Sequence, residues 1–226
     1  MTRFLIVAHG SPSDPAPPEA ALGALARAVA AQLGAPVSAA TLAAPGALEA
    51  AADGPVIVYP FFMAEGWFTR RELPRRLGGG AARILPPFGL EPALPGLVTR
   101  IVTQAAAEAG LDPARADLIL AAHGSRSPGQ AKATTFAMAA HLRRATRFWR
   151  VLPAFIEEPP FIADTAARSH GGLCLPFFAL RASHVDHDIP EALRQAGFAG
   201  RLLPAVGEHD GVAALIAESL RAHLPD

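Results

Sequence analysis

Two histidines and an acidic pair follow apolar segments in the second half of the sequence. His123 comes directly after LILAA, and His184 lies in a loop shortly after GGLCLPFF. Between them, Glu157 and Glu158 directly follow FWRVLPAFI. Two imidazoles with a carboxylate suit a borderline divalent metal such as iron, cobalt, nickel or zinc. They also suit proton transfer near neutral pH. Either histidine taken alone fits a capping or hydrogen-bonding role equally well.

The elements that must position these residues are short strands that alternate with helices. Short apolar runs indicate strands over 3–8, 36–42, 55–60, 82–85, 117–122, 148–155, 171–176 and 200–203. Helical stretches lie between them, over 19–33, 45–52, 68–77, 93–109, 130–146, 160–168, 187–196 and 210–223. This pattern predicts an α/β fold with parallel sheets that carry helices on both faces. Segments that follow parallel strands emerge at one sheet edge, so we expect His123, His184 and one of the two glutamates to converge.

The chain also contains an internal repeat. FLIVAHGSPSDP (4–15) matches LILAAHGSRSPG (118–129), and YPFFMAEGWFTRRELPRRL (59–77) matches LPFFALRASHVDHDIPEAL (175–193). A third block, ILPPFG (84–89), matches LLPAVG (202–207). Blocks repeated in the same order predict two similar four-stranded halves, 1–112 and 113–226, as a pseudo-symmetric pair. The cleft between the halves is the expected ligand site.

The first half lacks part of the chemistry-bearing set. His9 repeats His123, but the alignment places Trp67 at the position of His184 and no acidic residue near that of Glu157. We therefore expect the second half to be active and the first to have diverged. His9 either lines the cleft or is structural, and Trp67 offers a flat apolar face to a planar ligand.

Three polar residues beside the two histidines are candidates for substrate binding. Ser125 and Arg126 follow His123, and Arg181 precedes His184. Arginine pairs with carboxylates through bidentate hydrogen bonds, and the start of a helix binds anions. The serine fits a helix cap equally well, and the arginines fit a solvated surface.

Composition excludes several classes of protein. Lys+Arg and Asp+Glu are both 20, so the formal net charge is zero, which argues against a nucleic-acid partner. The single cysteine, Cys174, excludes an internal disulfide and fits a reducing cytoplasm. The apolar run near the N-terminus is too short for a signal peptide, and no window is long enough to span a membrane.

Taken together, the motifs resemble the class II tetrapyrrole chelatases. LILAAHGS and PFFALRASHVDHDIP are similar to the two motifs of the sirohydrochlorin chelatases of CbiX type, and their repetition resembles the two-repeat long form. The resemblance implies that His123 and His184 bind the metal and help to remove pyrrole protons, with Glu157 as the acidic group and Glu158 as the alternative. Ser125, Arg126, Arg181, His9 and Trp67 are then expected to contact the substrate.

The resemblance also implies the reaction and its partners. The expected activity is insertion of Fe²⁺, toward siroheme, or Co²⁺, toward cobalamin, into sirohydrochlorin, a planar ring with eight carboxylates. The metal is a substrate, and no permanently bound cofactor is expected. A non-catalytic metal or tetrapyrrole carrier on the same fold is the alternative. A phosphatase using His9 or His123 is disfavoured, because alanine precedes both histidines. We expect a cytoplasmic monomer, with a homodimer as the alternative.

Overall fold

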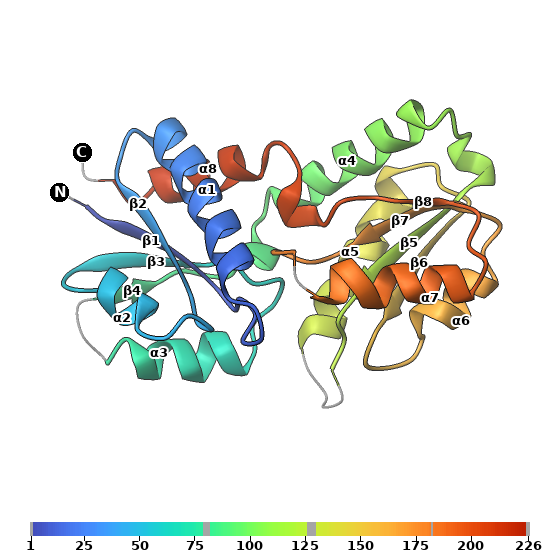
Figure 1. Cartoon of the computed structure of the whole chain (residues 1–226). Coiled ribbons are helices and arrows are strands. Elements are labelled where there is room, and N and C mark those ends of the chain that lie inside the picture. Colours follow the sequence, from blue (N-terminus) through green and yellow to red (C-terminus); the bar gives the residue numbers. More distant parts are fainter. Residues whose placement is uncertain (1, 79–81, 126–129, 182, 225–226) are drawn as a thin grey trace. The chain divides into compact units, whose positions relative to one another are not determined.

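The computed structural model describes residues 2–78, 82–125, 130–181 and 183–224. The chain forms two compact units (Figure 1). Unit 1 consists of Met1–Glu91 and Asp210–Asp226, and unit 2 consists of Pro92–His209. Within the described residues, no helix is both long and apolar enough to cross a membrane.

Unit 1 is a four-stranded parallel sheet in the order β2-β1-β3-β4. Helices α1 and α8 lie on one face of this sheet, and α2 and α3 lie on the other (Figure 1). Every residue of β1 is buried, as expected for a central parallel strand with both faces covered. The elements of unit 1 are β1 (Phe4–Ala8), α1 (Ala16–Leu33), β2 (Val37–Thr41), α2 (Ala47–Ala51), β3 (Val56–Pro60), the π-helix η1 (Phe68–Glu72), α3 (Leu73–Arg76), β4 (Ala82–Ile84), the short turn η2 (Phe88–Leu90) and α8 (Val212–Arg221).

Unit 2 repeats this arrangement with the strand order β6-β5-β7-β8, again all parallel. Helices α6 and α7 lie on the face turned toward the viewer in Figure 1, and α4 and α5 lie on the other. Its elements are α4 (Leu94–Glu108), the short turn η3 (Pro113–Arg115), β5 (Asp117–Ala122), α5 (Gln130–Ala145), β6 (Arg150–Phe155), α6 (Ile162–Ala167), β7 (Gly172–Pro176), the π-helix η4 (His184–Asp188), α7 (Ile189–Gln195), β8 (Arg201–Leu202) and the short turn η5 (Val206–Glu208).

The predicted α/β fold with two four-stranded parallel sheets is therefore confirmed. The compact units do not coincide with the two halves of the sequence repeat, however. Helix α8, from the second half, packs on α1 in unit 1, and α4, from the first half, packs on α5 and β7 in unit 2. The boundary between residues 112 and 113 stays a prediction about the duplication in sequence.

A buried carboxylate ties together the amino ends of the unit 2 strands. Asp117, at the start of β5, is fully buried and accepts hydrogen bonds from Arg150 Nε (2.8 Å) and Nη2 (2.6 Å). The Ser169 hydroxyl (2.9 Å) and the His170 amide (3.0 Å) also donate to it. Burial works against the charged form, but these hydrogen bonds hold the pKa of Asp117 below its ordinary value.

The strand order defines where each unit presents its chemistry. In unit 2 the chain runs from β5 to β6 on one side and then crosses to β7 on the other side of β5. Open parallel sheets bind ligands at the carboxyl ends of the strands where the order reverses in this way. The residues that follow β5 and β7 therefore lie where a ligand is expected to bind.

Candidate functional site

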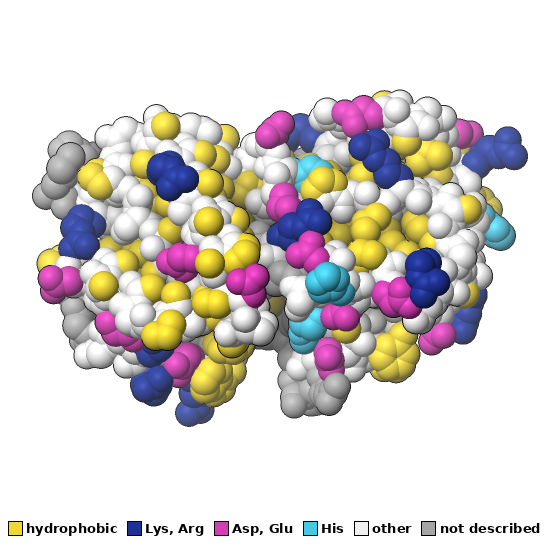
Figure 2. All heavy atoms as spheres, in the orientation of Figure 1, with side chains coloured by type: hydrophobic (Ala, Val, Ile, Leu, Met, Phe, Trp, Pro, Cys, Tyr) yellow, Lys and Arg dark blue, Asp and Glu magenta, His cyan; other side chains and the backbone are white. Residues whose placement is uncertain are grey.

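Two imidazoles meet at the carboxyl edge of the unit 2 sheet. His123 directly follows β5, and His184 is the first residue of η4, which follows β7. Their ring centroids are 4.7 Å apart and their planes are nearly perpendicular, at 83°. Figure 2 shows histidine side chains beside acidic ones where α7 begins. The convergence expected from sequence is present for these two residues, at the switch point between β5 and β7.

The turn after β5 holds His123 in place. Gly124 has a φ of 74°, and a Cβ built there would lie 3.0 Å from the Phe155 Cβ and from the Glu158 Cγ. A side chain at this position would meet both strain and crowding, so glycine is required. The turn also places the Gly124 carbonyl 3.1 Å from His123 Nδ1. The backbone carbonyl can only accept, so Nδ1 is the donor.

His184 lies on a helix, which corrects the expectation that it sits in a loop. The predicted helix over 187–196 begins earlier, as the π-helix η4, and continues into α7. Buried Val185, Ile189 and Leu193 anchor this helix in the core of unit 2. π-turns of this kind are frequently found at functional sites. The π-turn of η4 places His184 Nδ1 2.5 Å from Oδ2 of Asp188, which lies four residues later.

These two hydrogen bonds define the chemistry of both rings. Because Nδ1–H donates to an acceptor in each case, the neutral form of each ring has its lone pair on Nε2. A histidine whose other nitrogen donates to a carboxylate or a carbonyl is the usual form of a histidine metal ligand. The same Nε2 atoms are also the ones able to accept a proton. Asp188 was missed in the sequence, although its four-residue spacing from His184 on a helix was the available signal.

Glu157 and Glu158, which follow β6, make different contacts. Glu158 accepts a hydrogen bond from the Ser125 amide (3.0 Å) and from Lys132 Nζ (2.8 Å). The Lys132 bond, opposed by partial burial, lowers the pKa of Glu158 below its ordinary value. Glu158 therefore anchors the loop that follows His123. The Glu157 amide donates to the His123 carbonyl (3.0 Å), which places this half-buried glutamate beside the histidine.

The described residues contain no group of three or more histidine, cysteine, aspartate or glutamate side chains arranged to hold a metal ion. Cys174 is fully buried inside β7, and burial raises the pKa of its thiol to about 12, so it is not a ligand. Two imidazoles by themselves supply fewer ligands than the four of a closed structural site. Such a pair suits a metal that is bound transiently rather than a closed structural site.

The residues of unit 2 that were predicted to contact the substrate lie in different surroundings. Ser125 lies half-buried in the loop after His123. Arg181 donates to Asp186 (2.6 Å) and lies 3.5 Å from Glu208 Oε1. The hydrogen bond with Asp186 raises the pKa of Arg181 above its ordinary value. This arginine therefore ties the start of η4 to η5, and a substrate carboxylate would compete with protein carboxylates for it. Arg126 lies outside the described residues.

Unit 1 presents an equivalent position without the second histidine. η1 begins at Phe68 as η4 begins at His184, and the rings of His9 and Phe68 lie 4.2 Å apart, centroid to centroid. Phe68, rather than Trp67, therefore stands where unit 2 has His184, which corrects the sequence alignment by one residue. The Ala43 amide donates to the His9 carbonyl (2.9 Å), as the Glu157 amide does to His123. Alanine thus replaces the acidic residue.

The fold and the paired imidazoles define a class: a duplicated parallel α/β protein with one two-histidine site. Comparisons with known proteins specify it further. The CbiX family model matches residues 117–223. The structure of CbiX, the terminal enzyme for biosynthesis of siroheme in denitrifying bacteria, is 50% identical, with a TM-score of 0.88, over 99% of this chain and 100% of that one. The chain belongs to the CbiX family.

More distant structures share the fold. SirB from Bacillus subtilis with Fe³⁺ is 18% identical, with a TM-score of 0.77, over 98% of this chain and 95% of that one. The sirohydrochlorin chelatase SirB from Bacillus subtilis subspecies spizizenii, in complex with cobalt, is 17% identical, with a TM-score of 0.72, over 100% of this chain and 97% of that one. Among curated proteins, none matches the chain in sequence.

Proposed function

We propose that the chain is a sirohydrochlorin chelatase that inserts Fe²⁺ or Co²⁺ into the metal-free ring. The observation that carries the proposal is the pair of imidazoles, each with Nδ1 donating to an acceptor and Nε2 left with its lone pair. Membership of the CbiX family and the 50% identical relative, an enzyme of siroheme biosynthesis, support the same activity.

In this reaction the divalent metal replaces two pyrrole protons. His123 and His184 hold the incoming metal through Nε2, and the open positions around it are filled by water and then by ring nitrogens. A site with two protein ligands binds weakly enough to release the metal into the ring. Once the metal has left, the same Nε2 atoms accept protons from the pyrroles. The Glu157 carboxylate, whose backbone amide donates to the His123 carbonyl, is the alternative acceptor for one of these two protons.

The remaining features of the proposal follow from this exchange. No electrons are transferred, so no permanently bound redox cofactor is needed. Both units are present in one chain, so a cytoplasmic monomer is sufficient, and neither nucleic acid nor a membrane takes part. Ser125 and Arg126, which follow His123, and Arg181, if released from Asp186, are the groups of unit 2 that we propose for the carboxylates of the ring.

An anaerobic absorption time course with sirohydrochlorin and Fe²⁺ or Co²⁺ tests the activity. We expect many turnovers per chain above the spontaneous rate. His184→Ala should lower kcat/KM at least about 100-fold, since it removes both a metal ligand and a proton acceptor. His187→Ala, an exposed histidine on the same π-helix, is the matched control. A single stoichiometric spectral change without turnover would instead identify a carrier.

The two glutamates are separated in the same assay. Glu157→Gln should lower kcat while the affinity for Co²⁺ stays unchanged, because the carboxylate acts on protons. Glu158→Gln removes the charged partner of Lys132 and loosens the loop that carries Ser125. Its Co²⁺ affinity should therefore fall, because His123 lies in the same turn. Identical behaviour of the two variants would contradict this division of roles.

A further inference from the structure

Lys132 is the only lysine of the chain, and all the other basic residues are arginines. It lies in the first turn of α5, and its ammonium group contacts the end of β6 and the segment that follows. Nζ donates to Glu158 Oε2 (2.8 Å) and to the Pro159 carbonyl (3.1 Å), and it lies 5.6 Å from the centre of the Phe155 ring. These three contacts hold the Lys132 side chain in one direction, although it is 41% exposed.

The Glu158 carboxylate is shared between Lys132 and a backbone amide. Oε2 accepts from Lys132, while Oε1 accepts from the Ser125 amide (3.0 Å). The Glu158 side chain is only 17% exposed, so both hydrogen bonds are partly shielded from water. A Cβ built at Gly124 would lie 3.0 Å from Glu158 Cγ and 3.2 Å from Oε1. The carboxylate therefore lies directly against the turn that carries His123.

The amide that donates to Glu158 belongs to the same peptide group as the carbonyl that orients His123. This peptide group joins Gly124 to Ser125. Its N–H donates to Glu158, and its C=O accepts from His123 Nδ1 (3.1 Å). A peptide group is planar, so fixing the direction of the N–H also fixes the direction of the C=O. Hydrogen bonds in such a chain polarise one another, so the charge of Glu158 makes the carbonyl a better acceptor.

A lysine suits this shared carboxylate better than an arginine would. Arg150 takes both oxygens of Asp117, at 2.8 and 2.6 Å. A planar guanidinium that took both oxygens of Glu158 would compete with the Ser125 amide for Oε1. An ammonium group is a point charge that needs only one acceptor atom, so Lys132 leaves Oε1 to the backbone.

We propose that Lys132 is a positioning residue for the metal ligand His123, and that it acts through Glu158 and the peptide group that follows Gly124. The proposal rests on the proposed function, because it concerns how Nε2 of His123 is directed at the metal. It deepens that function by assigning the residue that fixes Glu158 in place. His184 needs no such chain of contacts, because its Nδ1 meets a carboxylate of its own helix directly.

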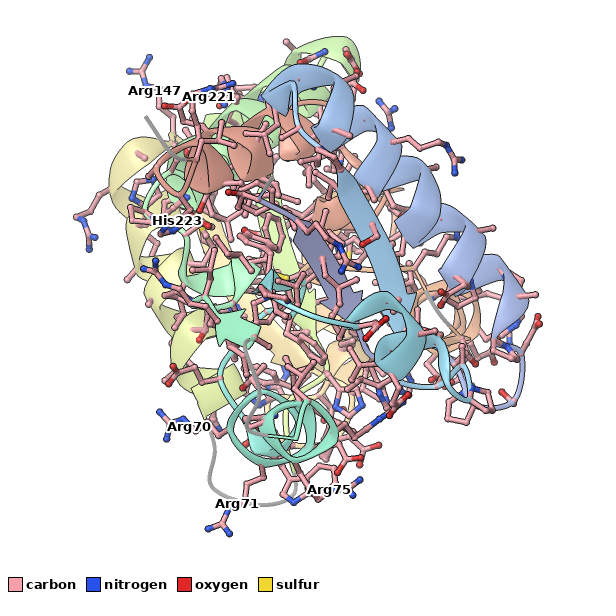
Figure 3. All side chains as sticks on the ribbon, turned by 90° about the vertical axis from the view of Figure 1, so that its left-hand side faces the viewer. Arg70, Arg71, Arg75, Arg147, Arg221 and His223 are labelled. Carbon is pink, nitrogen blue, oxygen red and sulfur yellow. The ribbon has the colours of Figure 1, made fainter. Side chains whose placement is uncertain are left out.

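Long-range proton–nitrogen correlation spectra of the full chain, without metal or ring, test the proposal. In Lys132→Gln we expect the single Nδ1–H form of His123 to become a mixture of tautomers, while His184 keeps its form and serves as an internal reference. Co²⁺ affinity should fall roughly fivefold, less than the tenfold or more that is typical for direct partners of a metal ligand. Arg147→Gln is the matched control, because Arg147 follows the end of α5 and extends into solvent (Figure 3).

Lys132→Arg separates the geometry of the contact from its charge. We expect it to recover Co²⁺ affinity only in part, because the guanidinium competes for Oε1 of Glu158. Full recovery would show that charge alone is sufficient and would overturn the argument for a lysine.

The spectra also separate this proposal from the proposed function. If Lys132→Gln keeps one tautomer of His123 and binds Co²⁺ as Arg147→Gln does, the positioning role is wrong even if chelation is observed. A change at both His123 and His184 would indicate a general loss of structure and would also count against it. If His123 alone changes but the parent chain shows no turnover, the positioning role stands and the chelatase activity is rejected.

Discussion

Replacing Asp188 with asparagine removes the charged acceptor on His184 Nδ1 and leaves the shape of the side chain almost unchanged. The perturbed contact is a single hydrogen bond of 2.5 Å. A hydrogen bond to a charged group contributes about 1.5–3 kcal/mol when shielded from water. The Asp188 side chain is 51% exposed, so solvent screening reduces this to roughly 1.4 kcal/mol. We therefore expect Co²⁺ affinity to fall about tenfold, the lower end of the range for such partners of metal ligands.

Two measurements on this variant report the Co²⁺ affinity and the tautomer of His184. Titration with Co²⁺, followed by its visible absorption bands, gives the affinity. Long-range proton–nitrogen correlation spectra of the metal-free protein give the tautomer of His184 directly. The introduced asparagine would be free to present either its oxygen or its amide group to Nδ1, so we expect the single Nδ1–H form to become a mixture. Glu191→Gln is the matched control, because Glu191 pairs with Arg194 on the helix that follows and carries the same charge.

The reasoning is refuted if Asp188→Asn and Glu191→Gln bind Co²⁺ equally and His184 keeps one tautomer in both. That outcome would mean that the π-helix alone orients the ring and that Asp188 is a surface residue. A loss of helical structure in the variant would show up separately in the backbone resonances of η4 and α7.

Two further predictions concern the duplication and the stability of unit 2. Phe68→His should create a second Co²⁺ site with His9, so the number of Co²⁺ ions bound should rise from one to two per chain in the same titration; a number that stays at one would contradict the equivalence of η1 and η4. Asp117→Asn should lower the free energy of unfolding by about 3 kcal/mol in urea at pH 7, because it leaves Arg150 without its buried partner. The folded-state pKa of Asp117 is lowered, so the carboxylate stabilises above its unfolded value of about 4. The difference between the two proteins should therefore shrink as pH falls below about 4, and a difference that does not depend on pH would exclude the charge as its source.

The fold was predictable because parallel strands that are buried on both faces are continuous apolar runs in the sequence. All residues of β1 and β5 are apolar and buried except Asp117, which is buried but charged, and each run ends at the same AHG motif. The glycine of that motif is required at a positive φ in both units, which explains why the motif recurs. Periodicity also located the helices, but it could not distinguish a π-turn from an α-turn, so His184 was expected in a loop.

Pairings between distant residues could not be predicted. Arg181 contacts Asp186 and Glu208, and no local pattern indicates the second contact, because Glu208 lies 27 residues away. Glu157 and Glu158 are adjacent in sequence and chemically identical, but Glu158 accepts hydrogen bonds from Lys132 of α5 and from the Ser125 amide, which lie 26 and 33 residues away. Ion pairs of this kind depend on which helices and strands pack together, and the local sequence does not indicate that packing.

The sequence by itself determined the two-fold repeat, the parallel sheets and the meeting of His123 with His184, because strand direction dictates which segments share an edge. Only the tertiary structure decided the state of each ring. The Gly124 carbonyl and Asp188 select which nitrogen of each imidazole donates, and Phe68 in unit 1 replaces such a ring with an apolar face. These choices depend on distances of a few ångströms between side chains, which are fixed by packing rather than by pattern.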